Sequence, residues 1–396
     1  MTLSAPMRRS VSRGPAHGEA GDASCPHRPP CPGCPRYGEP GVAPAALATL
    51  EVLARQHGLP GVAVVSGATS GFRLRARLAI RGRLGAPKLG LFQLGTHRLV
   101  HIPNCSVQHP LINRVAAVVR RALIDANVAP YAEAAHVGVA RHLQVVVERA
   151  SQSAQVVLVA NSATVEPLIP CLDMIRERLG SELHSLWFSA HCERSNTILG
   201  PEFQNWCGPD SVIERFGGAE VHYPPGAFGQ NNLDIAERIV EHVRALVPEH
   251  ARVAEFYAGV GAIGLSLLSR VRDIRMNELS LHSLQGLALG LAGLDPESRA
   301  KVNVVPGPAG EATSAASDAD VVIADPPRKG LDRDILMHMG AQPPGRFIYV
   351  SCGLDSFLAD TERLTSSGKL RLGGLTVFNL MPFTEHVETV ACFERA

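Results

Sequence analysis

The chain has 396 residues, of which 45% are hydrophobic and 19% charged, a composition typical of a globular protein with an extensive core. A formal net charge of +1 excludes a global basic field, so any contact with nucleic acid must come from local patches. The sequence has no apolar run of the roughly 18 uncharged residues that a membrane span needs, and its length allows about two or three domains.

Residues 1–24 are polar and rich in Gly, Ala and Ser, and we expect a flexible leader there. This segment contains arginines but no apolar stretch, so it is not a secretory signal. The nine cysteines are odd in number and unevenly spread, which argues against a disulfide framework and for a reducing compartment. We therefore expect a cytoplasmic protein.

The Cys- and Pro-dense segment CPHRPPCPGCP predicts a metal site. Cys25, Cys31 and Cys34 stand in it with C-x5-C-x2-C spacing, and Cys105 follows in HIPNCSVQHP. Three clustered thiols and one remote thiol favour an iron–sulfur cluster over zinc, whose structural sites more often pair two C-x2-C knuckles. Zinc ligation and the absence of any metal remain the alternatives.

Three arginines alternate along FRLRARLAIR (72–81), so Arg73, Arg75 and Arg77 leave the same face of a predicted strand. One interpretation is a phosphate-binding stripe that makes up for the neutral net charge. The other is the solvated face of an edge strand.

The pattern of elements changes near residue 225. Before it, strand-like runs flank a helix in an α+β arrangement; after it, strands alternate regularly with helices, which predicts an α/β domain with a parallel sheet covered on both faces. The early helices are expected at 44–57, 111–127 and 165–179, and the early strands at 143–148, 155–161 and 183–189. The later strands are expected near 252–257, 272–277, 321–324 and 347–350, and the later helices at 233–246, 262–269, 280–292, 331–339 and 356–366.

The stretch EFYAGVGAIG (255–264) places three glycines between a predicted strand and a helix. Glycines there allow the backbone to approach a ligand, and Glu278, after the next strand, is placed to bind both hydroxyls of a ribose. The motif fits a nicotinamide, a flavin, S-adenosylmethionine or a purely structural turn. Tyr257 and Glu255 favour S-adenosylmethionine.

The strand in VVIADPPRKGL (321–331) ends in Asp325, and the two prolines after it hold an extended corner. Ligands of open α/β sheets bind at the carboxyl ends of strands. Asp325 is therefore either a capping residue of a tight turn or a carboxylate that faces a substrate. In the second case it can accept the imino N–H of uracil, where cytosine offers only an acceptor.

The run FIYVSCG (347–353) reads as a buried strand that ends in a thiol. Cys352 is either a small buried hydrophobe or a nucleophile. The stretch MPFTEHVETV (381–390) supplies Glu385, His386 and Glu388, and an acid near a thiol is the pair needed for covalent addition to an aromatic ring followed by proton removal. An exposed strand with alternating charges is the alternative for this stretch.

Together these residues resemble the RNA 5-methyluridine methyltransferase family, the TrmA-like enzymes that act on tRNA or large-subunit rRNA. The resemblance extends from about residue 25 to the end. It is carried by AFGQNN (227–232), FYAGVGAIG, the strand end at Glu278, DPPRKG, YVSC and the terminal HVE.

The resemblance implies a C-terminal class I, Rossmann-like S-adenosylmethionine-dependent methyltransferase domain over 226–396. It implies an N-terminal α+β iron–sulfur and RNA-binding region over 25–225. The implied site has Cys352 as nucleophile and Glu388 as base. The implied cofactor contacts are Gln230, Tyr257, Glu278 and Asp325, and the implied ligands of a 4Fe-4S cluster are Cys25, Cys31, Cys34 and Cys105.

Two departures from the family pattern stand out. The common SCNP continuation is here Ser351-Cys352-Gly353-Leu354, and the glutamine motif reads FGQNN instead of a bulkier variant. Too few residues precede Cys25 for an N-terminal TRAM β-barrel, so the chain is most similar to the shorter iron–sulfur members that modify 23S rRNA. RNA is thus the expected partner, with rRNA favoured and tRNA possible, and no protein partner is predicted.

Three other functions remain open at this stage. A cytosine-5 methyltransferase is one, although no Pro-Cys nucleophile pair is present. A non-catalytic RNA-binding or assembly factor would be expected to lack Cys352 or Glu388, and both are present. A nicotinamide oxidoreductase leaves DPPR, the thiol and HVE unexplained.

Overall fold

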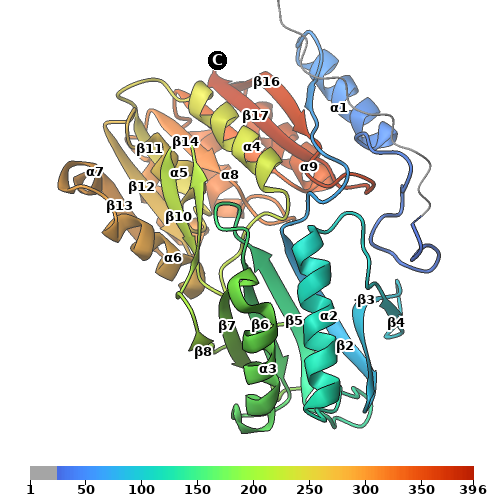
Figure 1. Cartoon of the computed structure of the whole chain (residues 1–396). Helices are drawn as coiled ribbons and strands as arrows, with labels where there is room; N and C mark the ends of the chain where they lie inside the picture. Colours follow the sequence, from blue (N-terminus) through green and yellow to red (C-terminus); the bar gives the residue numbers. More distant parts are fainter. Residues whose placement is uncertain (1–24) are drawn as a thin grey trace, which may run out of the picture.

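The computed structural model describes residues 25–396, so the leader expected at 1–24 lies outside the described residues. The described residues form an eight-stranded sheet, a seven-stranded sheet and a two-stranded hairpin. Figure 1 shows two units, with the larger sheet above the smaller one. None of the helices in this part of the chain is long and apolar enough to cross a membrane.

The predicted alternation of strands and helices builds most of the eight-stranded sheet. Its order is β1-β16-β17-β15-β14-β11-β12-β13, and the five strands from β15 to β13 in that order run parallel. Its C-terminal strands are β11 (Arg252–Phe256), β12 (Asp273–Glu278), β13 (Val302–Pro306), β14 (Val321–Ala324), β15 (Arg346–Ser351), β16 (Leu370–Phe378) and β17 (Glu388–Arg395). The accompanying helices are α4 (Leu233–Leu246), α5 (Ala262–Leu267), α6 (Leu281–Ala292), α7 (Pro296–Ala300), the 3-10 helix η3 (Ala309–Ala316), α8 (Arg333–Ala341) and α9 (Leu354–Ser366).

The central strands of this sheet are apolar on both faces, as a sheet covered by helices on both sides requires. All the residues of β14 are buried. In β15, Ile348 and Val350 pack into one hydrophobic core, while Phe347 and Tyr349 pack into another. Because side chains alternate across a strand, the two cores lie on opposite faces of the sheet and hold its strand ends in place.

One edge of the sheet departs from the predicted parallel arrangement. The last strand, β17, inserts between β15 and β16 and runs antiparallel to both. β1 (Ala63–Val65) pairs in parallel with β16, and α1 (Pro44–Gln56) contributes to the core that also contains Phe347. The structure therefore places residues 44–65 with the large sheet, although the sequence groups them with the N-terminal unit.

The smaller unit is the predicted α+β arrangement. Its sheet has the order β4-β3-β2-β5-β6-β7-β8, in which only β6 and β7 are parallel neighbours. Two helices, α2 and α3, lie over one face of this sheet (Figure 1). The elements are β2 (Arg75–Arg83), β3 (Ala86–Phe92), β4 (Leu99–His101), α2 (Pro110–Asp125), β5 (Ala140–Val147), β6 (Ala154–Ala160), η1 (Glu166–Leu168), α3 (Ile169–Leu179), η2 (Gly180–Glu182), β7 (Leu183–Ala190) and β8 (Gln204–Cys207).

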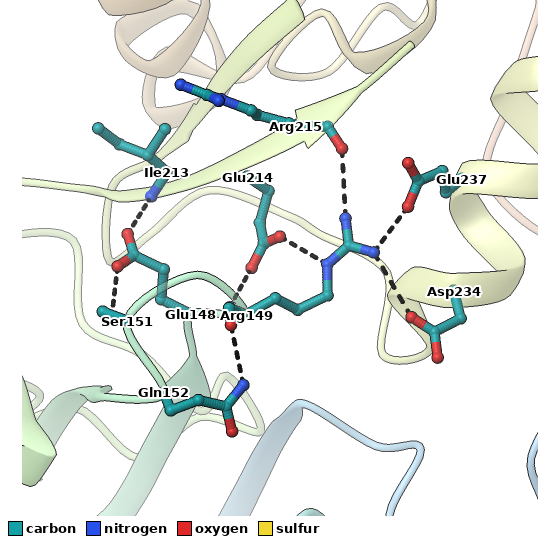
Figure 2. Close-up of polar contacts among 9 residues, drawn as sticks. All are labelled: Glu148, Arg149, Ser151, Gln152, Ile213, Glu214, Arg215, Asp234 and Glu237. Carbon is teal, nitrogen blue, oxygen red and sulfur yellow. Dashed lines mark hydrogen bonds and ion pairs between the residues drawn. The ribbon is translucent and has the colours of Figure 1, made fainter. Parts of the chain in front are cut away.

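A hairpin of β9 (Val212–Phe216) and β10 (Ala219–Tyr223) joins the two units and packs against α4, α5 and α6. Figure 2 shows the ion-pair network around it. Arg149, in the turn between β5 and β6, bonds from Nε to Glu214 Oε2 at 2.7 Å. Its Nη1 bonds to Glu237 Oε2 of α4 at 2.7 Å and reaches Asp234 Oδ1 at 3.4 Å. Arg149 thus ties the small sheet to the first helix of the large unit.

Arg75 and Arg77 lie on one face of β2, as predicted, but that face is covered; Arg73 lies two residues before the strand begins. Arg75 is 7% exposed, lies 5.6 Å from the ring centre of Tyr223 and donates from Nη1 to the Ala227 carbonyl at 2.9 Å. Arg77 donates from Nε to Gln144 Oε1 at 2.8 Å. A phosphate-binding role is therefore wrong for Arg75, because the segment after β10 packs over this part of the strand.

Candidate active site

Three strand ends meet at one edge of the large sheet. β14 ends just before Asp325, and its parallel neighbour β15 ends just before Cys352. β17 begins at Glu388 and pairs antiparallel with β15, so that Ser351 lies opposite Thr389. The sheet therefore brings together Asp325, Cys352 and Glu388, which the sequence places in three separate motifs.

All three groups have raised pKa values, with burial as the main cause. Burial, together with Glu388 and Asp325 nearby, raises the pKa of Cys352 to about 11. Burial raises the pKa of Asp325 to about 7, and burial with Asp325 beside it raises the pKa of Glu388 well above the usual range of a carboxyl group. Glu388 is 3% exposed, and its Oε1 has no hydrogen-bond partner among the described residues. Crowded, poorly solvated acids of this kind are typical of functional sites.

Arg328 supplies positive charge at this edge. Its guanidinium acts to lower the pKa values of both Cys352 and Glu388, against the effect of burial. Its Nη2 lies 3.2 Å from Nε2 of His386, and both side chains are exposed. The alternative of an exposed charged strand at 381–390 is therefore wrong. Glu385 and His386 are exposed but lie in the loop before β17, and Glu388 is buried at the start of that strand.

The glycine-rich turn after β11 has the geometry of a ligand-binding loop. Gly259 and Gly261 have left-handed φ angles of 59° and 90°. The amide of Gly259 donates to Glu278 Oε2 at 2.8 Å, so the acid at the end of β12 lies against the turn. A Cβ on Gly259 would meet no atom within 4 Å, whereas a Cβ on Gly264 would lie 2.2 Å from Glu255 Oε2. The turn is open on its outer side and packed tightly underneath.

Tyr257 and Glu255 also show features of a binding site. Tyr257 has a φ angle of 60°, and a left-handed non-glycine residue costs roughly 1–2 kcal/mol. Its hydroxyl donates to Asp332 Oδ2 at 3.2 Å. Glu255 is 3% exposed, and its Oε2 has no partner among the described residues. Glu255 lies under the turn against Gly264, and the open side of the turn at Gly259 fits the S-adenosylmethionine expected there.

Gln230, also expected to contact the cofactor, lies on the loop that leads into α4. Asn232 caps α4 and donates from Nδ2 to the Leu380 carbonyl at 3.2 Å, which links this loop to the segment before Glu388. Arg75 holds the same loop through the Ala227 carbonyl. The sequence does not predict that Asn232 and Arg75 anchor this loop. It shows only that each is a polar or charged residue next to apolar positions.

The four cysteines expected to bind a metal line one small cavity. Burial raises the pKa of Cys34 to about 11, with the neighbouring Cys105 acting in the same direction. As the side chains of residues 25–396 are arranged, no group of three or more His, Cys, Asp or Glu is found in position to hold a metal ion, although the four cysteines line the same cavity. Ligation of a cluster or of zinc therefore stays a prediction. The cavity is lined by Cys25, His27, Arg28, Cys31, Gly33, Cys34, Tyr37, Arg73, Leu91, Ile102, Cys105, Ser106, Val107 and Gln108.

Comparisons of the sequence identify related proteins. The profile of the tRNA (Uracil-5-)-methyltransferase family matches residues 315–396, the part that carries Asp325, Cys352 and Glu388. An uncharacterized RNA methyltransferase of Protochlamydia amoebophila is 35% identical over 382 residues, which cover 94% of this chain and 97% of that protein. An uncharacterized RNA methyltransferase of Leptospira interrogans is 26% identical over 398 residues, covering 94% of this chain and 98% of that protein.

A solved structure shares the fold. The tRNA (uracil-54, C5)-methyltransferase of Pyrococcus abyssi, in complex with S-adenosyl-L-homocysteine, superposes with a TM-score of 0.71 and 22% identity. The superposition covers 88% of this chain and 83% of that one. The mixed α/β architecture with a Rossmann-like methyltransferase sheet is therefore confirmed.

Proposed function

The chain belongs to the family of RNA (uracil-5-)-methyltransferases, which use S-adenosylmethionine, and from that premise we propose which of its residues perform the reaction and on which RNA. The observation that carries the proposal is the meeting of a thiol, the buried acid Glu388 and the partly buried acid Asp325 at adjacent strand ends. The proposed reaction is methyl transfer to carbon 5 of a uridine in 23S rRNA, in the cytoplasm.

Cys352 is the nucleophile. Carbon 5 of uracil reacts poorly with a methyl donor until a thiolate adds to carbon 6. That addition forms the Sγ–C6 bond and moves the ring electrons into an enolate with a nucleophilic carbon 5. The thiolate is the reacting form, so a pKa near 11 leaves the free thiol protonated, and Arg328 acts to favour ionisation. Positive charge brought into the site by a ligand acts in the same direction.

Glu388 is the base. S-adenosylmethionine supplies the electrophilic methyl group when it is bound. Once carbon 5 carries the methyl group, the Glu388 carboxylate removes the carbon-5 proton, the C5–C6 double bond forms again and the Sγ–C6 bond breaks. Its Oε1 has no hydrogen-bond partner among the described residues and is free to accept a proton, and the raised pKa of Glu388 makes its carboxylate a stronger base than that of an exposed glutamate.

Gln230, Tyr257, Glu278 and Asp325 hold the cofactor in this proposal. Glu278 lies against the glycine turn, where its carboxylate can bind the ribose hydroxyls. Asp325 has a second use, because its carboxylate can accept the imino N–H of uracil and so exclude cytosine. Carbon 6 is accessible only in a base that has left its stack, so we expect a flipped or single-stranded uridine.

Cys25, Cys31, Cys34 and Cys105 bind a 4Fe-4S cluster in this proposal. The supporting observation is that all four line one largely apolar cavity, as thiolate ligation of a cluster requires. Arg73 lines the same cavity and provides positive charge beside the thiols.

The choice of rRNA over tRNA rests on the expected cluster. The related Pyrococcus abyssi structure is that of a tRNA enzyme, so tRNA is the alternative to be tested. Mass-spectrometric mapping of 5-methyluridine in RNA from cells with and without the gene distinguishes the two. Loss of one rRNA methyl group supports the proposal, loss in tRNA overturns the choice of substrate, and no change in any RNA overturns the activity.

The roles of the two catalytic residues have their own test. Glu388→Gln should accumulate a covalent protein–RNA adduct, because addition and methylation proceed while proton removal fails. Cys352→Ala should form no adduct and no product, although it should bind S-adenosylmethionine as the wild type does. A Cys352→Ala variant that still methylates RNA would refute the mechanism.

A further inference from the structure

The proposed cluster site contacts the segment that leads into the proposed catalytic base, Glu388. Residues 25–40, here called the cysteine loop, pack on residues 379–387, here called the catalytic loop. The catalytic loop leads directly into Glu388 and contains His386, whose Nε2 lies 3.2 Å from Nη2 of Arg328. Whatever holds the catalytic loop therefore also holds the basic pair beside the nucleophile.

Arg36 makes the main polar contacts between the two loops. Its backbone amide donates to the Phe383 carbonyl at 2.9 Å. Its side chain is 11% exposed. Nη1 donates to the Thr384 carbonyl at 3.4 Å, and Nε lies 3.8 Å from Oε1 of Glu385. Three consecutive residues of the catalytic loop are thus held by one residue, which stands two positions after the third cysteine, Cys34.

The held residue, Phe383, is strained. Its φ angle is 66°, and a left-handed non-glycine residue persists only where its surroundings determine its conformation. Its ring centre lies 5.2 Å from that of Tyr37, and it shares a small hydrophobic cluster with Phe72 and Val107, flanked by Cys34 and other residues of the cysteine site. The surroundings that stabilise the strained turn therefore come largely from the cysteine site.

Arg73 lies between the cysteines and the catalytic loop. It lines the cysteine cavity, and its Nη2 is 3.9 Å from Sδ of Met381. Its Nε is buried without a hydrogen-bond partner among the described residues. The neighbouring groups that act to raise its pKa, against the effect of burial, are the thiols of Cys105, Cys34 and Cys31 rather than a carboxylate. A buried guanidinium needs a counter-charge, and a cluster bound through four thiolates provides one.

We propose that the cysteine loop is a brace for the catalytic loop, with Arg36 and Arg73 as positioning residues that hold Phe383, and through it the His386–Arg328 pair, beside the nucleophile. This inference rests on the proposed function, because it assigns the cluster a structural role in that same site. Loss of the cluster frees the cysteine loop, releases the strained turn and displaces the basic pair without removing any catalytic group.

Hydrogen exchange of the holoenzyme tests the brace without reference to activity. Peptides covering 379–387 should be protected in the cluster-loaded protein and should exchange faster in Cys34→Ser, which lacks one cluster ligand. Peptides of α2, in the small unit, should exchange equally in both proteins. Equal protection of 379–387 with and without the cluster, measured by iron content, would overturn the proposal.

Arg36→Met tests the positioning role with the cluster still bound. Its iron content and cofactor affinity should stay at wild-type levels, exchange at 379–387 should rise, and kcat should fall by at least about tenfold, since small misplacements of reacting groups cost that much or more. Arg55→Met, an exposed arginine of α1, is the matched control and should leave all four measurements unchanged. Unchanged exchange and kcat in Arg36→Met would refute the brace.

Tyr37→Leu provides a second variant if Arg36→Met fails to fold. It removes the ring that packs on Phe383 and should raise exchange at 379–387 in the same direction. The two proposals fail separately. A wild-type protein that methylates no RNA overturns the proposed function, whereas an active wild type with fully active brace variants overturns only the brace.

Discussion

Arg149→Met should destabilise the protein by about 3 kcal/mol, the lower end of the cost of removing one partner from a buried ion pair. The Glu214 side chain is only 4% exposed, so it loses its charge partner without gaining water. The backbone amide of Arg149 continues to donate to Glu214 at 2.8 Å, which limits the loss. The more exposed partners Asp234 and Glu237 contribute about 1 kcal/mol or less each.

Urea denaturation followed by circular dichroism measures this loss. Arg215→Met is the matched control, because its ion pair with Glu220 joins side chains that are 74% and 49% exposed, and it should cost less than about 1 kcal/mol. Equal losses in the two variants would refute the reasoning, since burial would then not decide the strength of the pair.

The loss in Arg149→Met should also depend on pH. Burial raises the pKa of Glu214 even in the wild type, and removing Arg149 takes away a charge that acts to lower it. The pKa of Glu214 is therefore higher in the folded variant than in the unfolded chain. Above this folded-state pKa, Glu214 is ionised in a buried position without its charge partner, which lowers the free energy of unfolding. The deficit should be largest at pH 8 and shrink as the pH falls toward 4.5, the ordinary value of a glutamate.

Two further predictions concern the site and its scaffold. The rate at which iodoacetamide alkylates Cys352 should follow a pKa near 11 in the cofactor-free protein. Glu388→Gln should lower that pKa, because it removes a neighbouring negative charge. Peptide mass spectrometry of the alkylated protein over a range of pH measures both values, and an unchanged or raised pKa in Glu388→Gln contradicts the proximity of the two groups. Gly264→Ala, whose Cβ would lie 2.2 Å from Glu255 Oε2, should cost about 1–3 kcal/mol and weaken S-adenosylmethionine binding. Gly340→Ala, in α8 with no atom within 4 Å of its Cβ, should instead stabilise by about 0.5 kcal/mol in thermal unfolding, so a loss of stability there would contradict the assigned geometry.

Much of the fold follows from local patterns in the sequence. The helix predicted at 233–246 is α4 with the same bounds, and the strands predicted near 252–257 and 321–324 are β11 and β14. These elements are predictable because apolar periodicity and turn residues act over a few positions. The place of the last strand is not, since insertion of β17 between β15 and β16 depends on pairing between segments distant in the chain.

The same division applies to the site. The sequence by itself determined the chemistry available: a thiol at a strand end, an acid before two prolines, a glycine turn followed by an acid, and four cysteines in two segments. Only the tertiary structure decided that Glu388 is buried next to Cys352, that Arg75 is covered, and that the cysteine loop contacts the catalytic loop. Residue type sets what a group can do, but burial and proximity arise from packing between distant segments, which no local pattern encodes.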